Sequence, residues 1–582
     1  MIIRRAYNSP DTCRILLLLL LFLVGCQPIP DKTFEVKVRL PQDPETLNPV
    51  NYTNVYGLQI IHLLFQTLLN TEDLDSQLRP LLASGLPVVV QKDSLTYITY
   101  QIRKEAIWDN AAPVTAQDVV FSMKVIKCPL VNNEKLQMQY EAVQDVISNN
   151  TNPEEVTFVC KRNYPNLDRL TGDLFIIPAY LFDPTGLLAQ FSLSDLIIQE
   201  ESLKKHTNII SFAEWFNTGK FSRDENILRG SGAYQLSDWK TGRQVVVQKK
   251  QQWWAEKLSN KPEYLTANPA RINFQIVPEN MTAVLSLKRE ALDIYSNVPA
   301  TEFLQLTQDE AMQKKYNFFT PETYDFTYLG INGRLEKFAD KKTRQAIAHL
   351  LDINNMIKVT QQSFAVRTIG PVKPGDPNYN TSVALYNYNI NKAIQLLQAA
   401  GWQKENNQWV RIVEEEKIPL TINLQYKAGN NDYEDIALIF RQAAAEAGIP
   451  VEIQAMEGST LGSNLRAHHF EIFIRSMSGG PAEYNFKSIL HSVSAVPNGY
   501  NYTNFGTAES DTLIDAINET FSPELKSRYL KKFQQILYEE ANIIFLFVLK
   551  NRIAIHKRLQ NTKITTSKAG YDVSAFTLGS PQ

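Results

Sequence analysis

Cysteine is scarce in this sequence, and it also has few long apolar runs and no excess of charge of one sign. The 582 residues contain 4 cysteines, 59 Lys and Arg against 61 Asp and Glu, and 44% hydrophobic residues. The cysteine count excludes a disulfide-dense scaffold. The balanced charge, without a basic run, argues against a nucleic-acid-binding protein. Beyond the N-terminal segment, no stretch is apolar enough to span a membrane.

The short motifs of catalysis and of metal or nucleotide binding are absent as well. The sequence has no GxSxG, HExxH, P-loop or GxGxxG, and Ser459 in "GSTLG" (458–462) stands in the wrong place for a nucleophile elbow. His468 and His469 are adjacent, so their side chains would point apart and make a poor metal-ligand set. We therefore expect no cofactor and no metal. Carboxylate pairs of the glycosidase kind stay open, because no local signal selects one.

The one marked apolar run lies at the N-terminus, in "LLLLLLFLVGCQPIP" (16–30). It is shorter than the roughly 20 apolar residues of a spanning helix, and arginines precede it, which is typical of an export signal. The run ends in "LVGC", the pattern of a bacterial lipobox. We expect residues 1–25 to be a lipoprotein signal peptide and Cys26 to carry the lipid. An ordinary signal peptide that contains a cysteine is the alternative.

The exported part of the chain would keep two further cysteines, Cys128 and Cys160. Both lie in the same N-terminal region, one after a predicted helix and the other in a predicted strand. They form a disulfide, or they remain two buried free thiols, and the sequence leaves both readings open.

The residue pattern predicts a mixed α/β protein. Strict alternation predicts strands at residues 34–40, 94–102, 420–426, 451–456 and 470–477. Helical spacing predicts helices at residues 57–69, 114–126, 341–357, 389–402, 433–449 and 524–541. The order strand, helix, strand over residues 420–456 favours a parallel crossover unit. A chain of this length is too long for one core and favours two or three lobes.

Seven segments, in order, resemble the extracytoplasmic substrate-binding proteins of peptide and nickel ABC importers. The segments are "DPETLNPVN" (43–51), "LRPLLASGLP" (78–87), "YQIRKEAIWDNAAPVTAQDVVFSM" (100–123), "GSGAYQLSDWKTGRQVVVQKKQQWW" (230–254), "DKKTRQAIAHLLDINNMI" (340–357), "YNINKAIQLLQAAGW" (388–402) and "NGYNYTNFGTAESDTLIDA" (498–516). Each is moderately specific, but their order and spacing over nearly the whole mature chain are highly specific.

This resemblance implies an α/β, two-lobe periplasmic-binding-protein fold, class II-like and of the large peptide-binding type. An extra subdomain is inserted in lobe I. The boundaries carried over are lobe I at residues 31–80, 206–325 and 547–582, the inserted subdomain at 81–205, and lobe II at 326–546. The chain would cross between the lobes near residues 325–326 and 545–546. The ligand would lie between the lobes and be buried when they close.

The function that the resemblance implies is that of an ABC-transporter substrate-binding lipoprotein, not of an enzyme. It would capture peptides and deliver them to permease and ATPase subunits. We expect an exported monomer, anchored by lipid in the periplasmic space or at the outer face of the cell membrane, with no nucleic-acid partner. Because relatives in this class also bind sugars, opines and metal chelates, a non-peptide solute is the alternative. A surface hydrolase or a structural lipoprotein is a further alternative.

The resemblance also implies a set of ligand-binding residues. They are Asn54, Val55 and Tyr56 on lobe I, Met477, Ser478 and Gly479 on lobe II, and Tyr500 and Tyr502. Peptide-binding members typically carry an aspartate in a "GW..D" segment, which pairs with the amino terminus of the ligand. Here "MSGGPAEYN" (477–485) lacks both the tryptophan and the aspartate, and Glu483 is the nearest acid that would substitute. A buried ammonium without a carboxylate partner would be costly.

Overall fold

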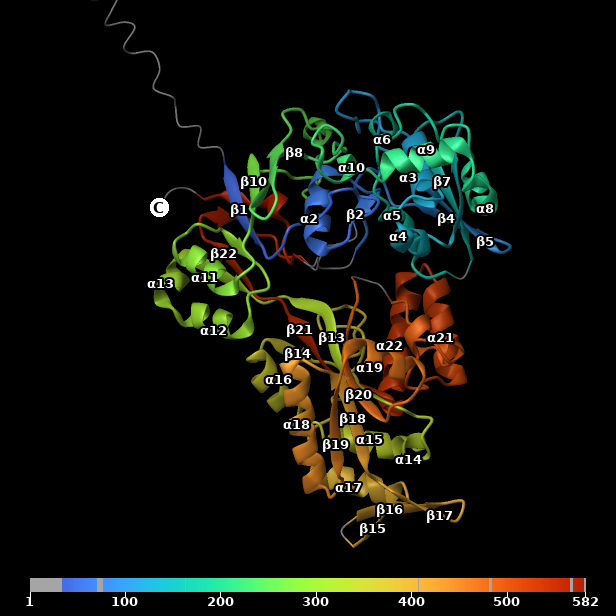
Figure 1. Cartoon of the computed structure of the whole chain (residues 1–582), viewed down its shortest axis with the longest axis vertical. Coiled ribbons are helices and arrows are strands. Elements are labelled where there is room, and N and C mark those ends of the chain that lie inside the picture. Colours follow the sequence, from blue (N-terminus) through green and yellow to red (C-terminus); the bar gives the residue numbers. More distant parts are fainter. Residues whose placement is uncertain are drawn as a thin grey trace, which may run out of the picture.

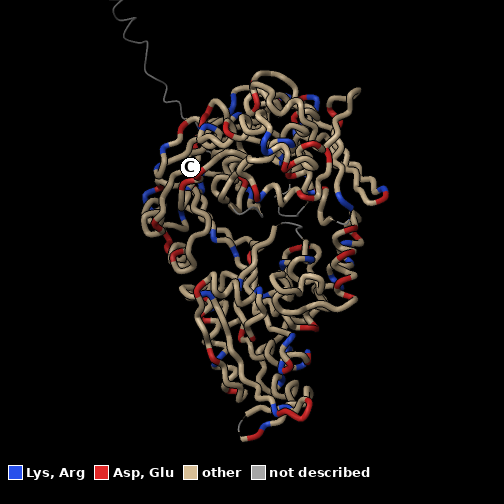
Figure 2. Tube along the Cα trace, turned by 45° about the vertical axis from the view of Figure 1, so that its right-hand side comes forward, with Lys and Arg blue, Asp and Glu red and all other residues tan. Residues whose placement is uncertain are grey.

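The computed structural model describes residues 34–70, 77–162, 164–406, 408–480, 484–565 and 569–579. These residues form two α/β lobes, with a further subdomain beside the first lobe (Figure 1). Acidic and basic residues are interspersed over both lobes (Figure 2). The segment 1–25, Cys26 and Glu483 lie outside the described residues. Within the described ranges, no helix is both long enough and apolar enough to cross a membrane.

Lobe I is built around a seven-stranded sheet of order β12-β22-β11-β1-β10-β9-β8. Its central strand, β1 (Glu35–Leu40), confirms the strand predicted at 34–40 and runs parallel to β10. The other strands are β8 (Tyr234–Lys240), β9 (Gln244–Lys249), β10 (Arg271–Ile276), β11 (Ile294–Tyr295), β12 (Tyr316–Phe319) and β22 (Ile553–His556). The helices of this lobe are α2 (Val55–Leu64), α11 (Asn280–Lys288), α12 (Ala300–Gln308) and α13 (Glu310–Lys315).

The inserted subdomain has a four-stranded antiparallel sheet of order β4-β5-β7-β6. The strands are β4 (Val88–Lys92), β5 (Leu95–Gln101), β6 (Val143–Ser148) and β7 (Glu155–Lys161). The helices are α3 (Ala116–Lys127), α4 (Glu134–Gln139), α5 (Leu167–Gly172), α6 (Ala179–Phe182), α7 (Leu193–Ile198), α8 (Glu200–Leu203), α9 (Thr207–Phe216) and α10 (Lys220–Arg223). The ring of Phe182 lies 6.2 Å from that of Phe216 and 5.4 Å from that of Phe221, so α9 and α10 pack beside α6, and the boundary at residue 205 stays a prediction.

Lobe II is a six-stranded sheet of order β14-β21-β13-β20-β18-β19 with helices on both faces. The strands are β13 (Glu322–Ile331), β14 (Ala365–Arg367), β18 (Ile422–Lys427), β19 (Val451–Met456), β20 (Ile472–Ser478) and β21 (Ile543–Lys550), and a small sheet of β15 (Gln403–Glu405), β16 (Gln408–Val413) and β17 (Glu416–Pro419) projects from the lobe. The helices are α14 (Glu336–Ala339), α15 (Lys341–His349), α16 (Ile353–Gln361), α17 (Ile390–Ala399), α18 (Asn431–Glu446), α19 (Gly458–Arg466), α20 (Lys487–Leu490), α21 (Ala508–Glu519) and α22 (Pro523–Glu540). The predicted crossover is confirmed, because β18 and β19 pair in parallel.

The cores follow from this layering. Along β13, Leu329 and Ile331 belong to the core on one face of the lobe II sheet, while Phe326 and Tyr328 belong to the core on the other. This is the period-two alternation of a strand buried on both sides. In lobe I one continuous core joins the main sheet to the inserted subdomain, and a smaller core lies under α11, α12 and α13. Lobe I and the subdomain are therefore one packed unit, and lobe II is a second.

The chain crosses between the lobes where β12 gives way to β13 and where β21 gives way to β22. The linking residues are 320–321 and 551–552, and the backbone N–H of Asn551 donates to the carbonyl of Pro321 at 2.8 Å. The crossings predicted at 325–326 and 545–546 lie inside β13 and β21 instead. The hinge end of β13, "ETYD" (322–325), is polar and mostly half-buried, whereas β21 stays apolar through Leu549, so composition marks the end of neither strand.

Two predicted helices have different bounds in the structure. The helix predicted at 57–69 ends at Leu64, because Phe65 adopts an extended conformation with φ −121° and ψ 150°. The helix predicted at 341–357 is divided into α15 and α16. Asp352 causes the break: its side chain accepts a hydrogen bond from the backbone N–H of Asn355 at 3.1 Å and so begins a new helix. Helix α3 begins with a capping box formed by Thr115 and Asp118.

The two cysteines of the subdomain are free thiols, so the disulfide reading is wrong for this structure and the other reading holds. Both are buried, and burial raises the pKa of each thiol to about 12. The Cys128 thiol donates to the carbonyl of Pro129 at 3.5 Å. Thiols in this state are weak nucleophiles, and their role is to fill the core.

Candidate functional site

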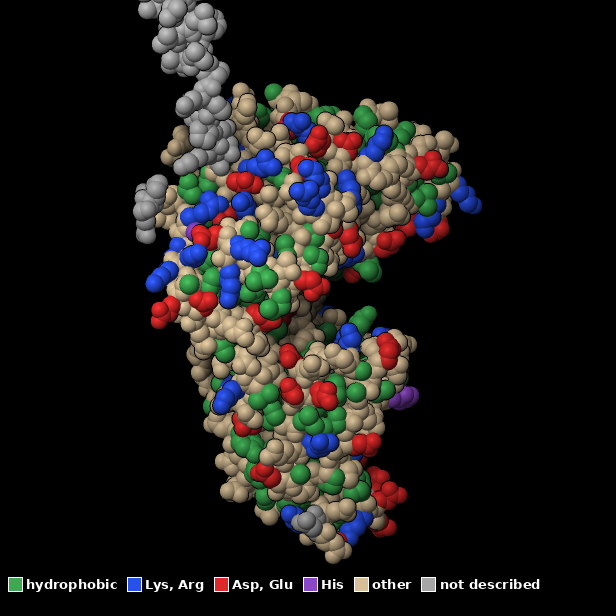
Figure 3. Space-filling model, turned by 60° about the vertical axis from the view of Figure 1, so that its left-hand side comes forward, with side chains coloured by type: hydrophobic (Ala, Val, Ile, Leu, Met, Phe, Trp, Pro, Cys, Tyr) green, Lys and Arg blue, Asp and Glu red, His purple; other side chains and the backbone are tan. Residues whose placement is uncertain are grey.

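A cavity of about 840 Å³ lies between the two lobes. The molecular surface is deeply hollowed at the same level in the space-filling view (Figure 3). Most of the wall comes from lobe I and its subdomain. The lobe II wall consists of Phe326, Pro371, Met477, Ser478, Gly479, Gly480, Asn485, Phe486 and Ile489. A cavity of this size and position is the expected site of a ligand that both lobes contact.

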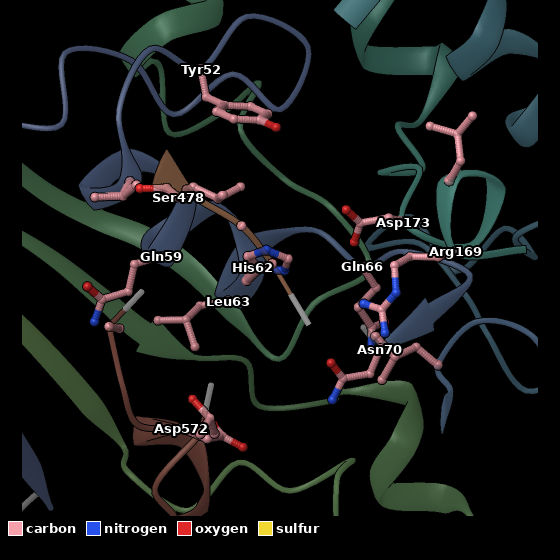
Figure 4. A pocket seen from close by; sticks show the side chains of 18 of the residues that line it. Tyr52, Gln59, His62, Leu63, Gln66, Asn70, Arg169, Asp173, Ser478 and Asp572 are labelled. Carbon is pink, nitrogen blue, oxygen red and sulfur yellow. The ribbon is translucent and has the colours of Figure 1, made fainter. Parts of the chain in front are cut away.

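Helix α2 forms the central part of the lobe I wall. Its buried face is Gly57, Ile60, Ile61 and Leu64, which pack into the core. The opposite face lines the cavity with Val55, Leu58, Gln59, His62 and Leu63 (Figure 4). The two faces follow from the helical period, since residues three and four apart share one side. Polar side chains on an otherwise apolar helix are thus directed at the ligand space.

The N-terminus of α2 is fixed by Asn54. Its amide oxygen accepts hydrogen bonds from the backbone N–H groups of Tyr56 at 3.1 Å and Gly57 at 2.9 Å. Its amide nitrogen donates to the carbonyl of Pro44 at 3.1 Å, which ties the helix to the turn before it. Asn54 therefore lines the cavity mainly as a helix cap.

The floor of the cavity is formed where the "GSG" segment (230–232) packs against the end of α2. A Cβ placed on Gly232 would lie 2.4 Å from the carbonyl oxygen of Leu63, so the glycine permits this close approach. The carbonyl of Ser231 accepts hydrogen bonds from the indole N–H groups of Trp253 at 3.1 Å and Trp254 at 3.0 Å. The two ends of the segment "GSGAYQLSDWKTGRQVVVQKKQQWW" (230–254) thus pack together and form the floor of the cavity.

The subdomain contributes a charged end to the cavity. Arg169 lies in α5, and Asp173 directly follows that helix. In Figure 4 both lie near Gln66. Burial lowers the pKa of His62 below its ordinary value, and the nearby charge of Asp173 opposes this only in part. The imidazole is therefore neutral at pH 7.

The C-terminal segment of the chain provides another part of the lobe I wall. The Gln59 amide nitrogen donates to the hydroxyl of Tyr571 at 2.8 Å, which joins α2 to this segment. The carboxylate of Asp572 accepts a hydrogen bond from the backbone N–H of Ser574 at 3.0 Å. At the opposite rim, the Lys135 ammonium lies 4.9 Å from the centre of the Tyr52 ring.

The lobe II wall is built mainly from the end of β20. Ser478 donates its hydroxyl hydrogen bond to Asp325 on the neighbouring strand β13. The backbone N–H of Gly479 donates to the carbonyl of Tyr324 at 2.8 Å. The described residues of this wall include no ionisable side chain. Lobe II offers a ligand backbone groups, small or apolar side chains and the amide of Asn485.

The lobes also touch at a point away from the hinge. The Lys526 ammonium, on α22 of lobe II, donates to the side-chain oxygen of Asn166 in the subdomain at 3.3 Å. Phe521, just before α22, packs against the lobe I core. Burial lowers the pKa of Lys526, and the charge of Asp168 acts in the other direction. Asn166 also lines the cavity, so this contact lies at its edge.

The structure brings together five of the predicted ligand-binding residues. Asn54, Val55, Met477, Ser478 and Gly479 all line the cavity. Their contact with a ligand stays a prediction.

Three other predicted residues are not among the lining residues. Tyr56 is half-buried against the lobe I core, Tyr502 is 8% exposed within a lobe II core, and Tyr500 is 58% exposed. Tyr502 is a packing residue because its ring meets Phe473 at 6.1 Å and lies under the Arg475 guanidinium.

Sequence reasoning missed Gln59, His62 and Gln66. The signal was present for Gln59 and His62, since these polar residues recur at helical spacing between the apolar positions 57, 60, 61 and 64 of "YGLQIIHLLFQ". It also missed the contributions of the subdomain and the C-terminal segment, which depend on contacts between segments far apart in the chain. Among the described residues, no group of three or more His, Cys, Asp or Glu is arranged to hold a metal ion.

The sequence profile "Bacterial extracellular solute-binding proteins, family 5 Middle" matches residues 77–495. The oligopeptide-binding protein AppA of Bacillus subtilis is 25% identical over 552 residues, which cover 92% of this chain and 90% of AppA. The periplasmic murein peptide-binding protein MppA of Escherichia coli is 20% identical over 93% of both chains.

Solved structures share the fold. AppA from Bacillus subtilis in complex with a nonapeptide aligns with a TM-score of 0.61 and 22% identity, over 94% of this chain and 99% of that one. The unliganded open form of MppA aligns with a TM-score of 0.73 and 17% identity, over 94% of this chain and 98% of that one. Both alignments extend through the two lobes and the inserted subdomain.

Proposed function

Because this chain belongs to family 5 of the bacterial extracellular solute-binding proteins, we propose that it captures peptides between its two lobes and delivers them to an ABC importer. The observation that carries the proposal is the cavity of about 840 Å³ with walls from both lobes. In the described chain the lobes are linked at residues 320–321 and 551–552. Two such linkers allow rigid-body closure, which a ligand favours because both walls contact it only in the closed form.

The chemistry of the walls suits a peptide. The cavity volume falls in the range of roughly 300–1,000 Å³ that is typical of ligand sites. Lobe I offers amides, an imidazole and charged groups, and lobe II offers backbone groups at the end of β20. An extended peptide carries donors and acceptors along its whole length, so it can satisfy such walls directly or through water.

The remaining parts of the proposal concern the setting of the protein. We propose that it is exported, cleaved before Cys26 and anchored by a lipid on that cysteine, and that it acts as a monomer. Its partners would be permease and ATPase subunits, and it would bind its solute without changing it chemically. Glu483 would carry the negative charge that meets the ligand's amino terminus on lobe II. The family alone supports a place outside the cytoplasm.

Native mass spectrometry tests this function directly. The mature chain without its lipid-bearing cysteine, residues 27–582, is purified from cells and measured before and after partial unfolding. We expect bound masses that fit di- to penta-peptides, and a rise in Tm when an equimolar pool of such peptides is added to the stripped protein. A single non-peptide mass would keep the fold and overturn the ligand. No bound mass and no shift in Tm would overturn peptide capture.

A further inference from the structure

Gln66 occupies a distinctive position at the floor of the cavity. It follows Phe65, the residue that ends α2, and its backbone carbonyl accepts a hydrogen bond from Ile176 of the subdomain at 3.0 Å. The residue is only 6% exposed, yet it lines the cavity. In the close-up view its side chain lies beside Asn70 and Arg169 (Figure 4).

The orientation of the Gln66 amide is set by its neighbour Trp254. The indole N–H of Trp254 donates to the side-chain oxygen of Gln66 at 3.1 Å. An indole nitrogen can only donate, so the atom that faces it must be the amide oxygen. Within the described chain this is the side chain's sole hydrogen bond, and the NH2 group of Gln66 is left for the cavity.

The surroundings hold this orientation in place. Trp254 is 2% exposed, and its N–H also donates to the carbonyl of Ser231. Ser231 lies between two glycines that press against the end of α2, where an added Cβ on Gly230 would lie 2.5 Å from the carbonyl oxygen of Leu64. All these residues belong to lobe I and its floor. The NH2 group is thus fixed before lobe II closes.

We propose that the Gln66 NH2 group is a preorganised hydrogen-bond donor that selects ligands by an acceptor oxygen of the carbonyl type. The proposal rests on the proposed peptide function and makes it more specific. The oxygen is either a main-chain carbonyl or the C-terminal carboxylate of the peptide. A buried donor that stays unpaired is costly, so a ligand that lacks the oxygen at this point is rejected. A donor that is already oriented loses little entropy on binding, which favours tight ligands.

The test uses the tightest-binding peptide of an equimolar pool of di- to penta-peptides. Each carbonyl of that peptide is replaced in turn by a thioamide, whose sulfur is a weak acceptor, and the C-terminal carboxylate is replaced by a carboxamide. Kd values are measured by calorimetry on residues 27–582. In the native protein we expect one replacement to weaken binding by about ten-fold or more. A thioamide effect identifies a main-chain carbonyl, and a carboxamide effect identifies the C-terminus.

Variants connect that effect to Gln66. Gln66→Met removes the donor at similar volume. Gln66→Glu keeps an acceptor for Trp254, and it is measured at about pH 8 so that the carboxylate stays ionised. The control is Gln91→Met, since Gln91 is an exposed residue of β4 in the subdomain and does not line the cavity. In both Gln66 variants the unmodified peptide should bind about ten-fold more weakly than it binds the native protein. The replacement that weakens binding to the native protein should then have no further effect. The control should bind the unmodified peptide like the native protein and should keep the effect of that replacement.

The outcomes separate this inference from the proposed function. If the peptide binds and every replacement has the same effect in the native protein and in Gln66→Met, the donor role is overturned while peptide capture stands. If no peptide of the pool binds the native protein, both fail. A lowered Tm in Gln66→Met but an unchanged Tm in Gln66→Glu, together with lost binding in both, would still support the donor role.

Discussion

The two walls of the cavity are built differently. The lobe I wall contains a helix face, a glycine–tryptophan floor and a charged end, and its polar side chains are held by contacts within the lobe. The described lobe II wall has no ionisable side chain and consists of the end of β20 with a few apolar residues and Asn485. This difference indicates a division of labour. Lobe I is organised to recognise the ligand, and lobe II to cover it.

The largest expected effect compares one glycine from each wall. Gly232→Ala would place a Cβ 2.4 Å from a backbone carbonyl and should lower the free energy of unfolding by about 3 kcal/mol. Gly479→Ala meets nothing closer than 3.8 Å and should change it by less than about 0.5 kcal/mol. Urea unfolding followed by circular dichroism measures both. Equal effects would contradict the view that the lobe I floor is the more tightly packed wall.

A smaller effect is expected at the rim of lobe I. Asn54→Ala removes the cap of α2 and should lower the free energy of unfolding by about 1 kcal/mol. Peptide affinity should change by less than about three-fold, because the side-chain oxygen is already engaged by the helix. Asn54→Ser is the matched control, since serine also caps helices. An Asn54→Ala variant that folds normally but no longer binds would show a direct ligand contact instead.

The lobe I wall should also carry the pH dependence. Burial holds the pKa of His62 below its ordinary value, so the unfolded chain takes up its proton first as the pH falls. The free energy of unfolding is therefore lost as the pH falls through about 6.5 toward the folded pKa. Between about pH 7.5 and pH 5 we expect a smaller loss in His62→Gln than in the native protein, measured by urea unfolding. Identical profiles would show that His62 titrates as it does in the unfolded chain.

The smallest effect concerns the contact between the lobes. Lys526→Met removes the bond to Asn166 and should weaken peptide binding by about two-fold, with a slightly larger radius of gyration in the ligand-free protein. Lys532→Met is the control, because Lys532 lies on the same helix but pairs with Glu509 inside lobe II. Small-angle X-ray scattering and calorimetry measure the two quantities. A change of the same size in both variants would remove the interlobe role.

Much of the fold was predictable from the sequence. Alternation identified β1, β5, β18 and β19, because in each of these strands one face is more buried than the other. The family resemblance supplied the two lobes and the inserted subdomain. The hinge was placed inside β13 and β21, since residues 322–325 at the hinge end of β13 are polar and β21 stays apolar through Leu549, so composition marks the end of neither strand. Only the partner strands show where each sheet ends.

The site was less predictable. Val55 and Met477 line the cavity as expected, but Tyr502 is a core residue, and its aromatic side chain suited either role. Gln66 was missed because its role depends on Trp254, a residue far along the chain. Contacts of this kind are set by packing between distant segments. Neither local pattern nor spacing encodes them.

Hydrogen–deuterium exchange with and without bound peptide tests the central claim most directly. The account predicts that peptide protects α2, including the segment that ends at Gln66, together with the end of β20 on the opposite lobe. Protection should be stronger on lobe I, where the ligand is recognised. Protection of one lobe alone, or of surfaces outside the cavity, would contradict capture between the lobes.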